Sequence, residues 1–362
     1  MLIERARRLT LDGDAASAAS LLQIARQHDP DRAATLLDAS ADVRIECVPS
    51  GASLALLAQE RQGPIVVERP LARGIAPLAR ALPPGSYVAE ASRDGHATVR
   101  LPFVVAPGRA LSFSIALPPA SAVPEGFCVV PGGAWIVGGD RSAPGAEPRR
   151  EVVLPPFAIS ARVVTMGEYA EFLSALDPEE ARRRVPRVGG VPLAQAGEDG
   201  RYAPPWIDPD GDLVRADDPA CGVSALDADA YAAWRARRTG LPLRLPTSDE
   251  WEVAARGADE RAYPWGHGWD PTLSWNIVSR GRLRGLHTVG SRPLDRSPFG
   301  VLDAGGLVRN WTSTRTPSGG RLVRGGAFQA AADQCRIGRV TDAPEDSAYI
   351  TFGLRLCLSW SA

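Results

Sequence analysis

Hydrophobic and polar residues recur with different periods along this chain, and the change of period separates it into parts. Through residues 2–38 alanine and leucine recur at helical spacing, which predicts helices. From Val43 to Leu117 short alternating runs are separated by turn residues, and this pattern predicts a small β-sandwich. Residues 118–124 are rich in Pro, Ala and Ser and are predicted to form a linker.

Beyond the linker, capping signals and alternation predict both helices and strands. Thr165 and Glu168 have the spacing of a capping box, and Thr247 and Glu250 have the same spacing. The two boxes open helices predicted at Tyr169–Leu173 and at residues 245–256. The other predicted elements are a helix at 223–234 and strands at 126–138 and 152–159.

The stretch from Arg321 to Leu356 has an unusual arrangement. An apolar-basic alternation ends at Gly325 and Gly326, which predicts a strand that stops where the backbone passes close to another segment. A closing strand is predicted at 352–356 from its period of two. The residues between, 327–351, have no sustained period, and a long irregular segment between two strands is usually functional.

Composition excludes several classes of protein. The chain has 362 residues, enough for two or three domains, and a net charge of −1, which favours neither nucleic acid nor an anionic membrane. No apolar run has the length of a membrane span, and the first residues do not read as a signal peptide. Five scattered cysteines form no CxxC pair, so we expect reduced thiols and a cytoplasmic protein.

Several motifs of the third part occur together in a known family. They are Arg324-Gly-Gly-Ala-Phe328, Cys335-Arg336, Gly353-Leu-Arg355, Leu245-Pro-Thr-Ser-Asp-Glu-Trp-Glu252 and Tyr263-Pro-Trp-Gly266. From about Glu125 to Trp360 the chain resembles the formylglycine-generating enzyme superfamily, or sulfatase-modifying-factor domain. The resemblance implies an α+β architecture, the C-type-lectin-like fold of that superfamily.

Weaker resemblances concern the first two parts. The turn Pro49-Ser-Gly-Ala52 resembles the Pro-Glu-Gly-Ala turn of PEGA domains, and the N-terminal helices resemble one tetratricopeptide-like pair. Four parts are therefore expected: a helical segment at 1–40, a PEGA-like β-sandwich at 42–117, the linker at 118–124 and the formylglycine-generating-enzyme-like domain at 125–362.

The resemblance also indicates which chemistry this chain lacks. Oxidases of the family hold Cu(I) between two cysteines five residues apart, and here these positions are Ala330 and Cys335. Alanine has no ligand atom, so no catalytic residue is expected, and copper is expected only if Cys335 retains oxidase chemistry. Cys335 is otherwise interpreted as a partly buried structural thiol.

Other metal sites of the superfamily are also altered. Leu307 and Asn310 replace an asparagine and a glutamate of a calcium site, and arginines follow the retained Asn276 where the family has an acid. Four scattered histidines do not supply the three-histidine iron site of a second enzymatic branch. We therefore expect no resident metal.

The preferred functional interpretation is a non-catalytic recognition or scaffold protein of a bacterial signalling or conflict system. It would bind a protein partner through the 327–351 surface. One alternative is a ligand-binding variable protein of a diversity-generating retroelement, and another is a copper- or thiol-dependent formylglycine-generating oxidase that uses Cys335.

Arginines and aromatic residues are over-represented among binding hot spots, which selects the expected contact residues. The expected binding residues are Arg324, Phe328, Gln329, Arg336 and Arg339, with Asn310 and Trp311 nearby.

Overall fold

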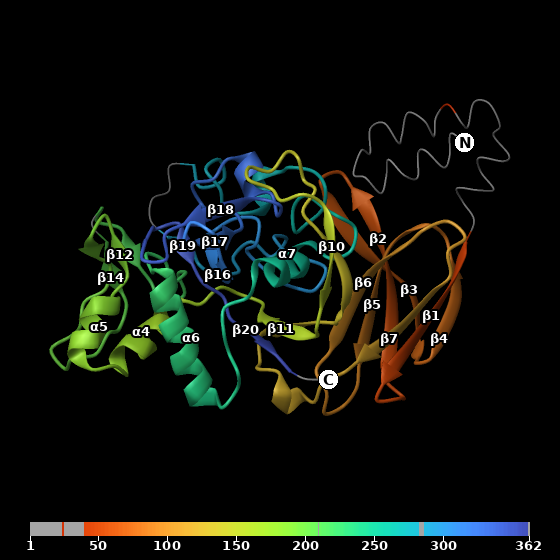
Figure 1. Cartoon of the computed structure of the whole chain (residues 1–362), viewed down its shortest axis with the longest axis horizontal. Coiled ribbons are helices and arrows are strands. Elements are labelled where there is room, and N and C mark those ends of the chain that lie inside the picture. Colours follow the sequence, from red (N-terminus) through yellow and green to blue (C-terminus); the bar gives the residue numbers. More distant parts are fainter. Residues whose placement is uncertain (1–23, 25–39, 209, 282–285, 361–362) are drawn as a thin grey trace.

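The computed structural model describes residue 24 and residues 40–208, 210–281 and 286–360 (Figure 1). The helices expected at 2–38 lie outside the described residues except for Ile24. A β-sandwich lies at one end of the molecule and helices α4, α5 and α6 lie at the other end, with the C-terminal strands between them. Sheets and helices together make the α+β class that the resemblance implied.

The strands expected between residues 43 and 117 are present and form a sandwich. A three-stranded sheet with the order β4-β1-β7 covers strands of a larger sheet. In β1 every second residue is buried, so Val43, Ile45 and Cys47 face the core. The seven strands are β1 (Ala41–Val48), β2 (Ser53–Gln62), β3 (Ile65–Ile75), β4 (Leu78–Leu82), β5 (Gly85–Ser92), β6 (Val99–Val105) and β7 (Leu111–Ala116).

The larger sheet crosses the expected linker. Its seven strands have the order β20-β11-β8-β6-β5-β2-β3, and β6 pairs in parallel with β8 at Val99 and Val129. The residues between these strands lie on the sandwich, because Ala97 N–H donates to Pro118 O and Ala120 N–H donates to Gly95 O. The parts of the chain before and after the expected linker therefore share one sheet and one apolar core. The strands added beyond the linker are β8 (Phe127–Val130), β11 (Phe157–Ser160) and β20 (Cys357–Ser359).

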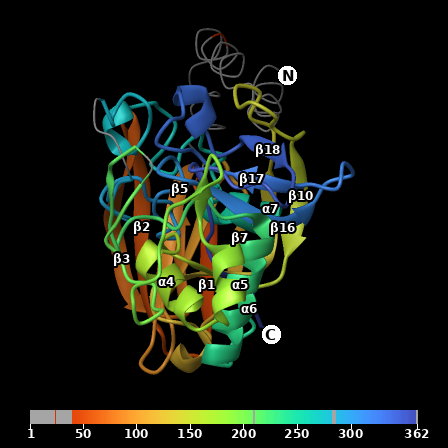
Figure 2. The ribbon, with the colours of Figure 1, turned by 90° about the vertical axis from the view of Figure 1, so that its left-hand side faces the viewer.

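A second sheet and the helices complete the molecule. The sheet has the order β18-β17-β16-β19, and α7 packs against β9, β16 and β17. Its strands are β16 (Arg309–Arg315), β17 (Arg321–Arg324), β18 (Val340–Ala343) and β19 (Phe352–Gly353). The helices are α4 (Met166–Ser174), α5 (Pro178–Arg184), α6 (Ala225–Thr239) and α7 (Ser248–Arg256), and Figure 2 shows α4, α5 and α6 in front of the sheets.

The predicted capping boxes are confirmed. In α4 and α7 the threonine side chain accepts from the third helical N–H, and the glutamate side chain accepts from the threonine N–H. Both reciprocal bonds satisfy backbone donors that a helix start leaves free. Helix α6 extends beyond its expected end and stops at Gly240, which adopts the left-handed conformation with φ of 71°.

Several expected strands differ from those observed. The strand expected at 152–159 is two strands, β10 (Arg150–Leu154) and β11, because Pro155 and Pro156 interrupt the ladder. The run at 126–138 forms β8 and β9 (Gly133–Val137), which pair with other strands instead of each other. The remaining short strands are β12 (Arg187–Val188), β13 (Val191–Pro192), β14 (Trp206–Ile207) and β15 (Leu213–Val214).

Two corrections fall in the stretch from Arg321 to Leu356. Of the closing strand expected at 352–356, only Phe352–Gly353 forms a strand, β19, and the next strand, β20, begins at Cys357. Arg355 lies between the two strands and is fully buried. The segment 327–351 also contains a strand, β18, which pairs with β17. Its pattern of Val340 to Ala343 is too short to give a periodic signal.

Candidate functional site

The paired glycines end β17 against another segment, as their sequence predicts. Gly325 has φ of 91°, and a Cβ atom there would lie 3.0 Å from the Trp251 ring. A Cβ atom on Gly326 would lie 2.3 Å from Gly305 O, which is closer than any side chain tolerates. The glycines thus let the chain pass over α7 and begin the segment that contains Cys335.

Cys335 lies at the end of a short 3-10 helix, Ala332–Cys335, and has no exposed surface. Its Sγ lies 3.9 Å from Ala330 O. Burial raises the pKa of the Cys335 thiol to about 12, although Arg309 and Arg339 act in the opposite direction. The thiol is therefore protonated at neutral pH, and the thiolate needed for metal binding or nucleophilic attack is scarce.

The surroundings of Cys335 do not fit a two-thiolate copper site. Ala330, Ala327, Tyr263 and Trp265 share its small apolar cluster, and none of them offers a second sulfur. Cu(I) prefers soft thiolate or thioether ligands, so a single protonated thiol beside an alanine methyl is a poor donor set. The second sulfur is lacking because residue 330 is alanine.

Arg324, an expected binding residue, lies inside the protein. Its guanidinium is 2.9 Å from Glu252 and 2.9 Å from Glu147, and its Nε donates to Ser248 Oγ at 2.7 Å. Glu252 is also fully buried and lies 2.9 Å from Arg256. These residues form a balanced cluster of two arginines and two glutamates, and in this structure it leaves Arg324 no surface for a partner.

Asn310 and Trp311 are also fully buried. Asn310 Oδ1 accepts from Trp251 Nε1 at 2.8 Å and from Arg355 Nε at 2.9 Å. Trp311 Nε1 donates to Val223 O at 2.9 Å. Both side chains therefore join β16 to neighbouring elements, and the amide oxygen of Asn310 has no lone pair left for a metal or a partner.

The other four expected residues differ in exposure. Phe328 is 2% exposed, whereas Gln329 is exposed. Arg336 is partly buried and donates to both carboxylate oxygens of Asp140 at 2.8 Å. Arg339 is partly exposed and takes part in no ion pair with a described residue. Gln329 and Arg339 are thus the most available of the seven, and Arg336 also holds the chain to Asp140.

The positions compared with the family's calcium sites are occupied by internal contacts. Leu307 is 1% exposed and packs in the main core. Asn276 Oδ1 accepts from Val278 N–H and Ser279 N–H, and its amide nitrogen donates to Ser274 O and Pro271 O. The described part of the chain contains no group of three or more His, Cys, Asp or Glu placed to hold a metal ion.

Sequence reasoning missed a cationic and aromatic group that surrounds Phe328. The Arg280 guanidinium lies 5.7 Å from the Phe328 ring, and the His287 ring lies 6.4 Å from it. His287 stacks on Trp275 at 3.7 Å, and Arg292 lies 4.2 Å from the Trp275 ring. The only sequence signal was the arginine-rich run after Asn276, which had been interpreted as a loss of calcium ligands.

The fold and the segment after the paired glycines define a C-type-lectin-like domain of the sulfatase-modifying-factor type. Residues 115–359 match the model of the Sulfatase-modifying factor enzyme 1-like domain, and the chain belongs to this family. The expected resemblance is therefore confirmed for this part of the chain. The PEGA-like interpretation of the sandwich stays a prediction.

The names of two curated relatives indicate different activities. The formylglycine-generating enzyme of Mycobacterium tuberculosis is 33% identical over 222 residues, which cover 51% of this chain and 72% of that protein. The mouse protein named inactive C-alpha-formylglycine-generating enzyme 2 is 29% identical over 259 residues, which cover 60% of this chain and 82% of the relative. The family therefore contains both enzymes and a protein named as inactive.

A solved structure supports the fold. PvdO from Pseudomonas aeruginosa superposes with a TM-score of 0.51 at 22% sequence identity, over 65% of this chain and 94% of PvdO. At this level of identity the similarity concerns the fold alone. Among the described residues, the helices are too short or too polar for any of them to cross a membrane.

Proposed function

We propose that this protein is a non-catalytic recognition module that binds a protein partner through the surface formed by residues 327–351. The observation that carries the proposal is the state of Cys335, a buried and protonated thiol with alanine at residue 330. Oxidation of a substrate cysteine in this family depends on two thiolates, and one of the two has no counterpart here. The existence of a relative named as inactive supports the same conclusion.

The alternatives remain distinct from this proposal. A variable ligand-binding protein would use the same segment to display diversified residues, and an oxidase would use Cys335 as its remaining thiol. The setting in a bacterial signalling or conflict system and the cytoplasmic location stay predictions.

Catalysis is tested directly. The protein is incubated with Cu(I), oxygen and a Cys-x-Pro-x-Arg peptide, and mass spectrometry is used to look for the aldehyde. We expect no turnover. Aldehyde that forms with the native protein and is lost in Cys335→Ser would establish the oxidase alternative.

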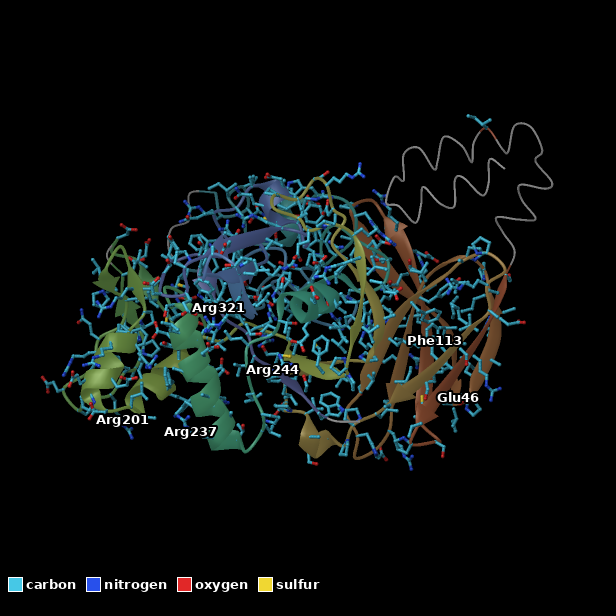
Figure 3. All side chains as sticks on the ribbon, viewed as in Figure 1. Glu46, Phe113, Arg201, Arg237, Arg244 and Arg321 are labelled. Atoms are coloured by element: carbon cyan, nitrogen blue, oxygen red, sulfur yellow. The ribbon has the colours of Figure 1, made fainter. Side chains whose placement is uncertain are left out.

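Recognition is tested by site-specific crosslinking. A photoreactive amino acid is placed at Gln329, which is exposed within the proposed surface, and in a matched variant at Arg237, which is exposed on α6. Figure 3 shows Arg237 on α6 well separated from Arg321 of β17. We expect a discrete crosslinked partner only at residue 329, competed by unmodified protein. The same species at both positions would argue against a specific surface.

A further inference from the structure

Four arginines around the segment that follows the paired glycines have an unusual environment. They are Arg280, Arg292, Arg309 and Arg339. In each, the Nε atom is enclosed by protein and has no hydrogen-bond partner among the described residues. A buried donor without a partner is costly, so the unpartnered Nε atoms mark guanidinium groups that the surrounding residues do not neutralise. The terminal Nη atoms of these arginines are not among the buried, unpartnered atoms and are the donors that a ligand would reach.

Arg309 and Arg339 form the central pair of this group. Asn310 of β16 and Val340 of β18 both pair with Arg324 of β17, so Arg309 and Arg339 lie one residue before matching positions on the two strands that flank β17. Both charges act on the Cys335 thiol. Burial, reinforced by the charge of Arg339, lowers the pKa of Arg309 to about 10. Burial likewise lowers the pKa of Arg339. Both groups remain charged at neutral pH, and the charge of Arg339 acts on Arg309 in a partly desolvated place.

No carboxylate of the described residues forms an ion pair with either arginine. Asp333 lies close enough to favour the charged form of Arg339 but makes no ion pair with it. Elsewhere the same sheet pairs its arginines. Arg321, labelled in Figure 3, contacts Asp229 at 2.6 Å and Glu345 at 3.3 Å. The lack of an ion-pair partner among the described residues is therefore specific to Arg309 and Arg339 and is not shared by Arg321 of the same sheet.

The start of the same segment adds cations and no acid. Arg280 and Arg292 flank Phe328 and Trp275, and each makes ring contacts in place of an ion pair. Burial, together with Arg280 and Arg292, lowers the pKa of His287 to about 4, so this imidazole is neutral at physiological pH. Fixed guanidinium charges with adjacent aromatic faces favour a ligand that carries several negative groups.

We propose that Arg309 and Arg339 receive a carboxylate from an acidic segment of a protein partner. The proposal rests on the proposed recognition function and names the chemistry of its ligand. A guanidinium presents its donors in a planar fork that matches a carboxylate, and the bound anion would also remove the repulsion between the two arginines. Arg280 and Arg292 supply charge for neighbouring carboxylates of the same segment.

The probe is a fluorescein-labelled peptide of alternating Asp and Glu, with a Ser-Gly peptide of equal length as the neutral control. Fluorescence anisotropy is measured at constant ionic strength. We expect the acidic peptide to bind the native protein, and Arg309→Gln and Arg339→Gln each to raise Kd about tenfold, as loss of a charge-assisted contact does. Arg237→Gln removes the same charge from α6 and is expected to leave Kd unchanged.

Folding is monitored in the same samples. Removing one of two cations that repel each other is expected to leave the melting temperature unchanged or higher, so a weaker affinity cannot come from unfolding. Arg309→Lys keeps the charge but loses the fork, and we expect it to recover only part of the affinity. Equal weakening by Arg237→Gln would mean that total charge, and not this pair, attracts the peptide, which would overturn the inference.

Two further outcomes would also overturn it. Inorganic phosphate that binds in isothermal titration calorimetry, and binds more tightly as pH rises from 6 to 8, while the acidic peptide does not bind, would assign the pair to phosphate. Peptide binding that neither arginine variant alters would place the acidic ligand elsewhere. Either result would leave the proposed recognition function standing, whereas aldehyde formation that depends on Cys335 would overturn that function without bearing on the arginine pair.

Discussion

Arg324 and Arg309 lie on neighbouring strands of one sheet, and their surroundings are opposite. Arg324 is completely buried and is matched by two glutamates, so it belongs to a neutral cluster that joins β17 to α7. Arg309 is partly buried, lies 5.9 Å from the Phe352 ring, makes no ion pair with a described residue and has its pKa lowered by the charge of Arg339. A buried cation with partners supports the fold, whereas a cation left without one is available to a ligand.

The largest expected effect is on the balanced cluster. Arg324→Met is expected to lower the free energy of unfolding by about 3–5 kcal/mol, because it leaves the buried carboxylate of Glu252 with one of its two cations. Arg183→Met is the control, since Arg183 pairs with Glu179 at the surface and is expected to change stability by less than about 1 kcal/mol. Urea unfolding measures both. A small effect of Arg324→Met would mean that the cluster is not structural.

Cys335 tests whether the unpaired arginines activate their neighbour. With a pKa of about 12 its thiolate fraction at pH 8 is about a thousandfold below that of a free cysteine, and burial slows labelling further. We expect native-state maleimide labelling, followed by peptide mapping, to modify Cys335 far more slowly than a free peptide thiol. Labelling at the rate of the peptide thiol would show that Arg309 and Arg339 activate it.

The buried carboxylates of Asp295 and Asp303 form a third charged group, and their contribution to stability is tested by lowering the pH. Asp295 and Asp303 are each 1% exposed, and burial raises the pKa of Asp303 to about 6. Burial and the charge of Asp303 also raise the pKa of Asp295. Between pH 6 and 4 the folded state therefore binds more protons than the unfolded state, so this contribution increases stability as pH falls.

Asp303→Asn isolates that contribution. Relative to this variant, the native protein is expected to gain up to about 2 kcal/mol of stability between pH 7 and pH 4.5. His287 acts in the opposite direction, because its pKa of about 4 is below the unfolded value, but it is present in both proteins and cancels. Urea unfolding at the two pH values gives the difference, and a constant difference would mean that Asp303 titrates normally in the fold.

The smallest expected effect concerns Arg309 in the absence of ligand. Arg309→Gln removes a repulsion of partly screened charges, so we expect a stability gain below about 1 kcal/mol that shrinks as salt is added. Arg237→Gln removes a charge from an exposed position on α6 and is expected to show less. A loss of several kcal/mol in Arg309→Gln would place Arg309 in the same structural class as Arg324.

Local signals in the sequence were sufficient for much of the fold. The capping boxes at Thr165 and Thr247 and the close approach at Gly326 depend on residues near in sequence or on backbone alone, and all three are present. The fate of a proline-interrupted run or a four-residue strand depends on which partner strand is available. For this reason β10, β11 and β18 were not predicted with their observed bounds.

The candidate site was harder to predict because the sequence does not show which residue a charged side chain will pair with in the fold. Arg324 and Arg339 look alike in the sequence, and only the fold brings Glu147, 177 residues away, to the first. Asn310 likewise becomes structural because Arg355 reaches it from 45 residues further along. That Arg339 belongs to a binding surface stays a prediction, whereas the burial of Arg324 and Asn310 required the structure.

The parallel contact between β6 and β8 has a consequence for how this chain tolerates cutting. The strands before residue 118 cover one side of β8, so their removal would leave an unpaired strand edge and would expose apolar residues that are now buried, such as Val129 and Phe157. Such edges recruit strands from other molecules and cause aggregation. The N-terminal sandwich therefore covers the strand edge of the family domain and protects it from pairing with other molecules. A fragment that begins at residue 118 is expected to precipitate rather than fold alone.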